Sequence, residues 1–180
     1  MNLRLLALPG AVCLCACQNT PAPYAPPEQR QPFENFAPYR INRLVDMADG
    51  DADKHFVRDI QGLSGTWRWT GKHPEVHVFL RTNKMLHCVV DFTIVEATFK
   101  DTGPVTLTFF VNGHPLGMKR YTAPGPEHFD KPVPPEWVEA GKEATIGAEI
   151  DKVWISPADH AALGFILTRM GLAQMETKQE

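Results

Sequence analysis

Apolar and polar positions alternate along most of the chain after its first third. Val90, Phe92 and Ile94, for example, fall on one side of an apolar run, while their neighbours fall on the other. A period of two is typical of a β-strand with one buried face. The pattern predicts strands at residues 66–70, 76–80 and 86–99.

Turn signals separate the later strands. Asn112 and Gly113 lie between two alternating stretches, residues 105–111 and 115–121, and both residue types tolerate a positive φ. They therefore predict a tight β-hairpin. Residues 101–104 predict a turn before it. A Pro-rich loop follows, and further strands are predicted near Phe129 and over residues 144–155.

The two ends of this region carry weaker helical signals. Apolar residues recur at helical spacing near its start and predict a short amphipathic helix, at Ile41, Leu44, Val45 and Ala48. Ser156 and Pro157 resemble a capped helix start. Two glycines within residues 163–172 are unfavourable in a helix interior. The C-terminal end therefore predicts one helical turn followed by a closing strand.

Seven or eight short strands at this spacing predict an all-β fold, an antiparallel β-sandwich of jelly-roll-like kind. We expect this single domain to span residues 41–175, with a polar tail at 176–180. Residues 18–40 are rich in proline and predict a disordered, semi-rigid tether. An alternative for this segment is a set of aromatic anchors for a partner, at Tyr24, Phe33, Phe36 and Tyr39.

The N-terminus has the layout of a secretory signal. One arginine precedes a short apolar run, and residues 1–16 are too short to span a bilayer as a folded helix. The ending Leu14-Cys15-Ala16-Cys17 resembles a bacterial lipobox. That resemblance implies a lipoprotein whose Cys17 is acylated, with palmitate among the expected groups. Gln18 in place of the aspartate associated with inner-membrane retention implies the outer membrane.

Composition narrows the partners and the redox chemistry. The formal net charge is −3, and no basic stripe is present, so nucleic acid is not an expected partner. Membrane attachment would come through the N-terminal lipid. Cys88 is the one cysteine outside the leader and lies in a strand-like run. It therefore predicts a small buried hydrophobic residue without a disulfide.

Metal ligands are poorly supported by spacing. Asp49, Asp51 and Asp53 alternate as at the start of a calcium loop, but lysine stands where the loop needs glycine, and Ile60 stands at its bidentate position. A solvated acidic turn is the favoured interpretation, with structural calcium there as the alternative. In an extended strand His73 and His77 would stand ~13 Å apart, too far to share an ion.

No catalytic set emerges from the sequence either. The two serines after the leader lack the glycine spacing of a nucleophile elbow. Scattered acids could supply a carboxylate pair for glycoside cleavage: Glu75, Asp91, Glu96, Asp151 and Asp159. Nothing in the sequence brings two of them together. A protein without catalytic residues is favoured, with a hydrolase as the alternative.

Aromatic residues give somewhat better support for binding. Sugar rings stack on flat side chains, and their hydroxyls need polar partners. The candidate ligand-binding residues are Trp137, Arg68, Trp69 and Trp154. The favoured interpretation of Trp67, Trp69 and Trp154 is nevertheless that they fill the core, with Arg68 paired to Asp159 or Asp151. For Trp137 the alternative is that it plugs one end of the sandwich.

Short patterns at residues 67–70, 133–137, 157–159 and 163–167 resemble galactose-binding-like, jelly-roll modules of bacterial glycan-handling proteins. The resemblance covers residues 55–172 and implies the fold more directly than a ligand. Together with the lipobox it implies a lipid-anchored envelope protein with non-catalytic binding, possibly of glycan. The alternatives are an assembly lipoprotein that binds other envelope proteins and a glycan- or ester-active enzyme.

Overall fold

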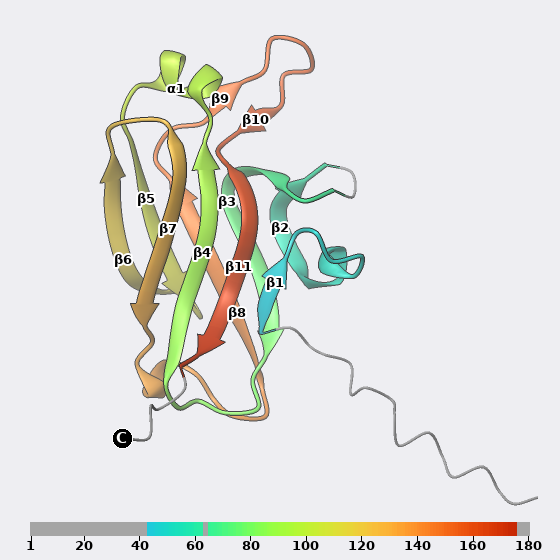
Figure 1. Ribbon diagram of the computed structural model, residues 1–180, viewed down its shortest axis with the longest axis vertical. Coiled ribbons are helices and arrows are strands. Elements are labelled where there is room, and N and C mark those ends of the chain that lie inside the picture. The colour runs from blue at the N-terminus through green and yellow to red at the C-terminus, as the bar shows by residue number, and fades with distance from the viewer. Residues whose placement is uncertain (1–42, 63–64, 176–180) are drawn as a thin grey trace, which may run out of the picture. The chain divides into compact units, whose positions relative to one another are not determined.

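The computed structural model describes residues 43–62 and 65–175 (Figure 1). The predicted signal peptide, Cys17, the Pro-rich tether and the polar tail lie outside the described residues. Strands dominate the described part of the chain, and the sole α-helix there is α1 (Glu96–Thr102). No helix within those residues is long and apolar enough to cross a membrane.

One antiparallel sheet has the strand order β6-β5-β8-β3-β11-β4-β7, with β1 added to β11 and β2 added to β3. A separate two-stranded sheet pairs β9 with β10. The strands are β1 (Leu44–Asp46), β2 (Phe56–Gln61), β3 (Arg68–Phe79), β4 (Leu86–Ile94), β5 (Val105–Val111), β6 (His114–Tyr121), β7 (Gly125–Pro132), β8 (Glu143–Ile150), β9 (Trp154–Ile155), β10 (Ala162–Leu163) and β11 (Ile166–Gln174).

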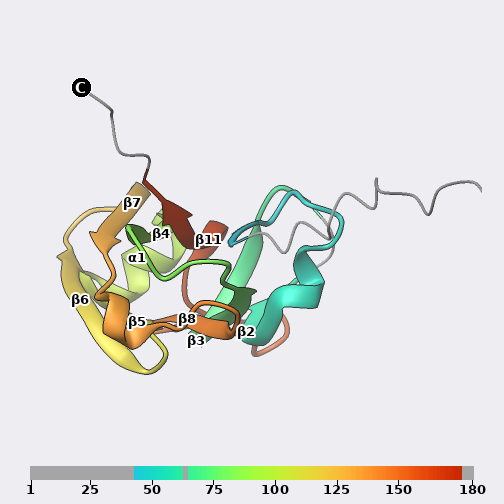
Figure 2. The ribbon, with the colours of Figure 1, turned by 90° about the horizontal axis from the view of Figure 1, so that it is seen from below.

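The sheet folds over at the junction of β3 and β11 into two layers (Figure 2). Strands β6, β5, β8 and β3 form one layer, and β11, β4 and β7 form the other. The junction is short. It consists of the pairs Trp69 with Ile166 and Arg68 with Leu167, and the remaining residues of β3 and β11 lie against other strands. This arrangement confirms the predicted all-β antiparallel sandwich.

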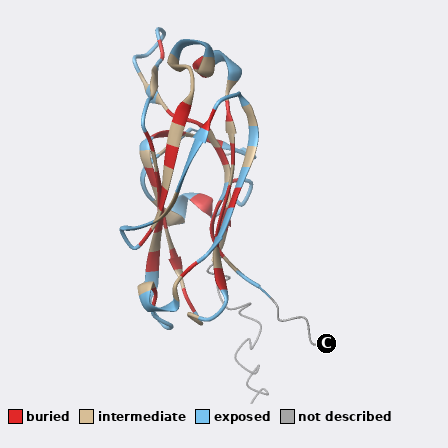
Figure 3. Cartoon of the chain, turned by 90° about the vertical axis from the view of Figure 1, so that its left-hand side faces the viewer, coloured by how far each residue is buried: buried red, intermediate tan, exposed pale blue. Residues whose placement is uncertain are grey.

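Alternate residues of the strands fill the space between the layers (Figure 3). On β5 every second residue is buried, from Val105 to Val111. Phe92 of β4 contacts Phe109 of β5 across the core, with ring centroids 6.0 Å apart. Phe109 in turn stacks on Phe129 of β7 at 3.8 Å. The predicted alternation therefore corresponds to the buried face of the sandwich.

The predicted hairpin is confirmed. Asn112 and Gly113 have φ values of 48° and 78° and connect β5 to β6, whose nearest paired residues are Val111 and His114. Asn112 also fixes its surroundings, because its side-chain amide donates to the carbonyl of Trp137 at 2.7 Å. The turn therefore reaches the loop that carries Trp137.

Two local predictions are wrong. The expected amphipathic helix near residue 41 is strand β1 in its described part, where Leu44 pairs with Gly171 of β11. The expected strand at residues 86–99 ends at Ile94, and α1 follows it. Gly103 ends α1 with a φ of 66° and donates its N–H to the carbonyl of Phe99. In the first case, pairing with β11 holds the chain in an extended conformation. In the second, the chain leaves the sheet after Ile94, and Gly103 ends the short helix that follows.

The C-terminal prediction is partly confirmed. Residues 157–159 form a turn rather than a helix, closed by the N–H of His160 on the carbonyl of Ser156 at 2.9 Å. The expected closing strand is present as β11. The residues before it form β10, which pairs with β9 and, like β2, contacts β3.

Candidate functional site

Two tryptophans lie at the start of β3. Trp67 is 45% exposed and is the one exposed aromatic side chain among the large hydrophobic residues of the described chain. Trp69 is half-buried and meets Trp67 edge-on, with ring centroids 6.3 Å apart and an interplanar angle of 89°. The pair therefore offers two indole surfaces at right angles. We refer to Trp67, Trp69 and the neighbouring Gln61 as the tryptophan surface.

Arg68 points the opposite way and is 2% exposed. Its Nη1 donates to the carbonyls of Gly65 at 3.0 Å and Trp67 at 3.1 Å, and its Nη2 donates to Asp53 at 3.4 Å. The expected pairing with Asp151 or Asp159 is wrong.

Both of those carboxylates are engaged elsewhere. Asp151 accepts the N–H of Thr106, and Asp159 accepts the N–H of Ala161 in its own turn. The hydroxyl of Ser156 and the N–H of Ala161 hold the pKa of Asp159 below its ordinary value.

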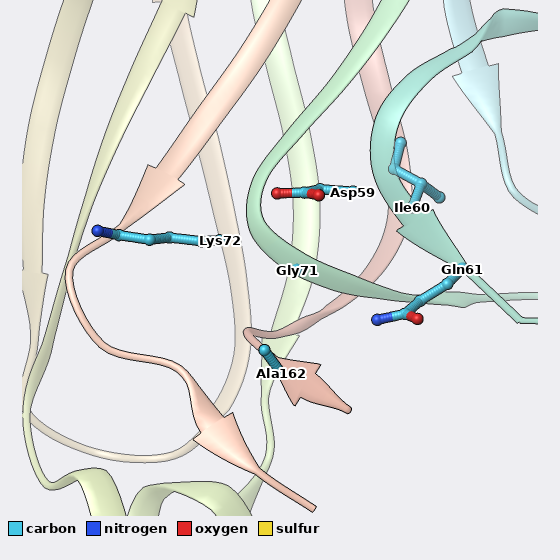
Figure 4. A pocket seen from close by; sticks show the side chains of 6 residues that line it. All are labelled: Asp59, Ile60, Gln61, Gly71, Lys72 and Ala162. Atoms are coloured by element: carbon cyan, nitrogen blue, oxygen red, sulfur yellow. The ribbon is translucent and has the colours of Figure 1, made fainter. Parts of the chain in front are cut away.

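A pocket of about 450 Å³ includes Gln61 of the tryptophan surface in its lining. Figure 4 shows the residues that line it. Gln61 connects the pocket to this surface, because it lines the pocket and lies directly opposite Trp69 across the β2–β3 ladder. Directly opposed residues of a ladder point to the same face. The full lining is Asp59, Ile60, Gln61, Gly71, Lys72 and Ala162. Ala162 comes from β10, so three strands enclose the pocket.

One polar group of the pocket, the Asp59 carboxylate, is held in place by the backbone. Asp59 has a φ of 53°, and its carboxylate accepts the N–H of His73 at 2.8 Å beside Gly71. Lys72 lies 3.9 Å from Glu149 of β8, and about half of its side chain is exposed. The pocket therefore presents the Asp59 carboxylate and, beside the indole rings, the Gln61 amide, while the Lys72 side chain borders it and is directed away from both (Figure 4). This combination can hydrogen-bond hydroxyl groups while an apolar face stacks.

Trp137 lies at the other end of β3, away from this surface. It is half-buried, packs against the core and stacks on His114 with ring centroids 5.0 Å apart. A second opening of about 450 Å³ includes Trp137, Asn83 and Asn112 in its lining. The packing agrees with the alternative that Trp137 plugs one end of the sandwich. Its remaining exposed part borders the opening.

Trp154 lies on β9, and its indole N–H donates to Asp101 at 2.6 Å. The donor that it would offer a ligand is therefore already used. Of the four predicted ligand-binding residues, the structure brings Arg68 and Trp69 together and places Trp137 elsewhere. Arg68 is too buried to contact a ligand directly.

The expectation that Trp67, Trp69 and Trp154 fill the core is wrong. All three are exposed or half-buried, and the inward position of this segment belongs to Arg68. Sequence reasoning therefore missed Trp67 as a surface residue. Strand parity places Arg68 on the same face as Thr70, which the structure shows to be buried, but alternation alone does not say which face is inward, so the sequence offered no local signal for it.

The acidic side chains are engaged by cations or by the backbone. The carboxylate of Asp51 pairs with Lys54 at 2.6 Å, and that of Asp53 pairs with Arg68. The two carboxylates therefore face different basic side chains. Within the described residues, no group of three or more His, Cys, Asp or Glu side chains is placed to hold a metal ion. The alternative of a calcium site near Asp49, Asp51 and Asp53 gains no support from this geometry.

Two of the acids considered for catalysis, Glu75 and Asp91, are paired with basic groups. Glu75 contacts Arg58 at 2.6 Å, and Asp91 contacts both Arg169 and His128. The hydrogen bond between Asp91 Oδ1 and His128 Nδ1 is 2.5 Å long. These contacts satisfy the carboxylates on two different faces of the sandwich. They do not form the pair of facing carboxylates that glycoside cleavage requires.

Cys88 is buried in the core, as predicted. Burial, with a smaller effect of Asp130, raises the pKa of its thiol to about 12. The thiol therefore stays protonated at neutral pH, and the nucleophilic thiolate does not form. Cys88 contributes packing rather than chemistry.

No protein-family model and no curated protein matches the chain. Solved structures give distant likenesses. A family 35 carbohydrate-binding module from an environmental isolate is 13% identical with a TM-score of 0.42, over 74% of this chain and 98% of that one. The CBM35 from Paenibacillus barcinonensis is 11% identical with a TM-score of 0.37, over 73% and 98%. With scores below 0.5, neither likeness bears on the ligand.

Proposed function

We propose that this chain is a lipid-anchored cell-envelope protein whose sandwich binds a glycan without catalysis. The observation that carries the binding proposal is the tryptophan surface. Trp67 is 45% exposed and stands at right angles to Trp69, and Gln61 of the same surface lines a polar pocket. A ligand that stacks on the exposed indole removes apolar area of both partners from water, which is favourable. A sugar ring supplies both an apolar face for stacking and hydroxyls for the pocket.

The polar lining favours a ligand with many hydroxyls over a fully apolar one. Asp59 and Gln61 provide acceptors, and the amide of Gln61 also provides donors. Both kinds of partner are needed, because each sugar hydroxyl donates and accepts. A hydrocarbon would leave these groups unpaired on binding, which costs free energy.

The binding proposal is tested by substituting one tryptophan at each end of the sandwich. The full chain is screened on a glycan array, and the dissociation constant of any bound sugar is measured by calorimetry. We expect Trp67→Ala to weaken binding about tenfold or more, equivalent to at least about 1.4 kcal/mol. Trp137→Ala is the matched control and is expected to retain the affinity.

The other outcomes assign different functions. Equal affinity of wild type and Trp67→Ala would contradict the proposed surface, and a loss confined to Trp137→Ala would move the site to the opposite end. Binding of no glycan at all would favour the assembly role, in which cross-linking captures a specific envelope protein. Release of a cleaved sugar or ester would favour the enzyme alternative. Unfolding curves of both variants show that each is folded at the assay temperature.

The anchor is proposed from the resemblance of residues 14–17 to a lipobox, with Cys17 as the acylated residue. In bacteria labelled with a palmitate analogue, we expect the wild-type protein to carry label and to fractionate with the outer membrane. Cys17→Ala is expected to lose both properties, because a diacylated cysteine supplies the membrane affinity. Cys15→Ala is the matched control in the same segment. Retained labelling of Cys17→Ala would contradict the assignment.

A further inference from the structure

We propose that Arg68 is a positioning residue for Trp67, with Asp53 as its counter-charge. This inference rests on the proposed function, because Trp67 is the residue assigned to the ligand. Arg68 itself is 2% exposed and lies on the face opposite Trp67, so it acts through the backbone. Its role is to hold the segment that presents the indole.

The guanidinium connects two peptide carbonyls on either side of Thr66. Arg68 Nη1 donates to Gly65 O at 3.0 Å and to Trp67 O at 3.1 Å. One planar group therefore closes a small loop that contains the Trp67 peptide. The preceding part of the chain also lies close, because a side chain at Gly62 would meet the Cδ of Arg68 at 3.9 Å. Arg68 thus lies beneath the chain that leads into β3.

Burial of the Arg68 guanidinium costs desolvation free energy, so a buried arginine at this position calls for a structural explanation. Its Nε has no hydrogen-bond partner within the described residues, and the one ion pair, to Asp53, is 3.4 Å long. An apolar residue of similar size would avoid the desolvation of a charge. What an apolar residue cannot do is donate to the two carbonyls around Trp67.

Trp67 has little else to fix it. Its ring contacts Trp69 edge-on, but 45% of the residue remains exposed, so core packing does not determine its position. An aromatic platform that is ordered before binding loses less conformational entropy when a ligand arrives. The Arg68 contacts supply this order at the backbone.

Asp53 connects the Arg68 contacts to a second element of the fold. It belongs to the 3₁₀-helix η1 (Ala52–His55), and its carboxylate is 70% exposed. The Asp53–Arg68 ion pair therefore joins η1 to the segment that carries Trp67. Solvent reaches the Asp53 side chain, whereas the Arg68 side chain is buried. Replacing Asp53 removes the counter-charge without opening the core. It is the milder of the two perturbations.

The test uses 5-fluorotryptophan labelling of the full chain, which reports each indole by ¹⁹F NMR without any ligand. We expect Arg68→Met to shift and alter the linewidth of the Trp67 resonance while the Trp137 and Trp154 resonances stay unchanged. Arg68→Lys is expected to behave in the same way, because an ammonium cannot span both carbonyls and Asp53. Asp53→Asn should give a smaller change at Trp67.

The matched control is Arg58→Met, which removes an arginine of the adjacent strand β2 whose guanidinium pairs with Glu75 at 2.6 Å. In the binding assay we expect Arg68→Met and Arg68→Lys to weaken the affinity about 2- to 10-fold, and Arg58→Met to leave it unchanged. Unfolding midpoints well above the assay temperature exclude loss of the fold, and Asp53→Asn keeps the test open if an Arg68 variant does not fold.

The results separate this inference from the proposed function. An unchanged Trp67 resonance in Arg68→Met and Asp53→Asn would overturn the positioning role, whatever the ligand. Full rescue by Arg68→Lys would also overturn it, because charge alone would then suffice. If Trp67→Ala fails to reduce glycan binding while Arg68→Met still alters the Trp67 resonance, the ligand assignment is wrong and the structural coupling stands.

Discussion

Replacing Phe92 by alanine is expected to lower the free energy of unfolding by about 3–5 kcal/mol. Phe92 is 2% exposed and contacts three other aromatic rings. Their centroids lie 6.0 Å away at Phe109, 5.5 Å at Tyr121 and 5.1 Å at Phe165. These partners come from β5, β6 and the entry to β11, so Phe92 joins both layers. Truncation would leave a cavity that none of them fills without moving.

Phe110→Ala is the matched control for this prediction. Phe110 is the neighbour of Phe109 on β5, but it is only half-buried and lies on the outward side of the strand. Its loss removes less buried area, and solvent fills the space, so we expect a smaller destabilisation. Chemical denaturation of both variants measures the difference. Equal losses for the two phenylalanines would contradict the central role of Phe92.

The strand pattern was predictable because burial on one face leaves a period of two in the sequence. Val90, Phe92 and Ile94 were expected to share a face, and all three are buried. The hairpin at Asn112 was predictable for a local reason, since a tight turn needs residues that accept a positive φ. Both signals involve neighbours in sequence, which is why they survive without knowledge of the partner strands.

The candidate site was less predictable because alternation does not say which face is inward. Around Arg68 the sequence reads as two tryptophans flanking one arginine, and hydrophobicity favours buried tryptophans. The structure has the reverse, since the Arg68 guanidinium finds carbonyls and Asp53 beneath the chain. The two carbonyls belong to Gly65 and Trp67, which are close to Arg68 in the chain, and Asp53 lies in η1, 15 residues earlier. Hydrogen-bond partners for the guanidinium, rather than hydrophobicity, therefore decided the orientation of this segment.

Short apolar recurrences were also ambiguous at β1. Leu44 and Val45 fit a helical spacing, but a segment of three residues forms a strand when the backbone of an adjacent strand pairs with it. Gly171 belongs to that strand, and an added Cβ there would meet the carbonyl oxygen of Arg43 at 2.2 Å. Only a glycine on β11 permits this approach. The information that fixes β1 thus lies more than a hundred residues away in the chain.

Replacing Gly164 by alanine is expected to lower the free energy of unfolding by about 1–3 kcal/mol and to deform the pocket. An added Cβ would lie 2.5 Å from the carbonyl oxygen of Gly71 and 3.0 Å from the hydroxyl of Thr70. The first contact is with backbone and cannot be relieved by a side-chain rotation. Gly164 also donates its N–H to the carbonyl of Thr70 at 2.7 Å. The segment must therefore move away from β3.

That movement has a consequence for binding, because Gly71 and Ala162 both line the pocket beside the tryptophan surface. We expect Gly164→Ala to weaken glycan binding at temperatures where the protein is still folded. Gly50→Ala is the matched control, since an added Cβ at Gly50 meets nothing within 4 Å. It is expected to leave stability unchanged or slightly raised, because alanine restricts the unfolded chain.

Thermal unfolding and calorimetry of the two variants decide the outcome. If Gly164→Ala matches Gly50→Ala in stability, the contact between Gly164 and Gly71 does not hold this segment against β3. If Gly164→Ala is destabilised but binds the glycan with wild-type affinity, the ligand touches the indoles of Trp67 and Trp69 without entering the pocket. Loss of both stability and affinity is the expected result, because the same backbone contact shapes the junction of the two layers and one wall of the pocket.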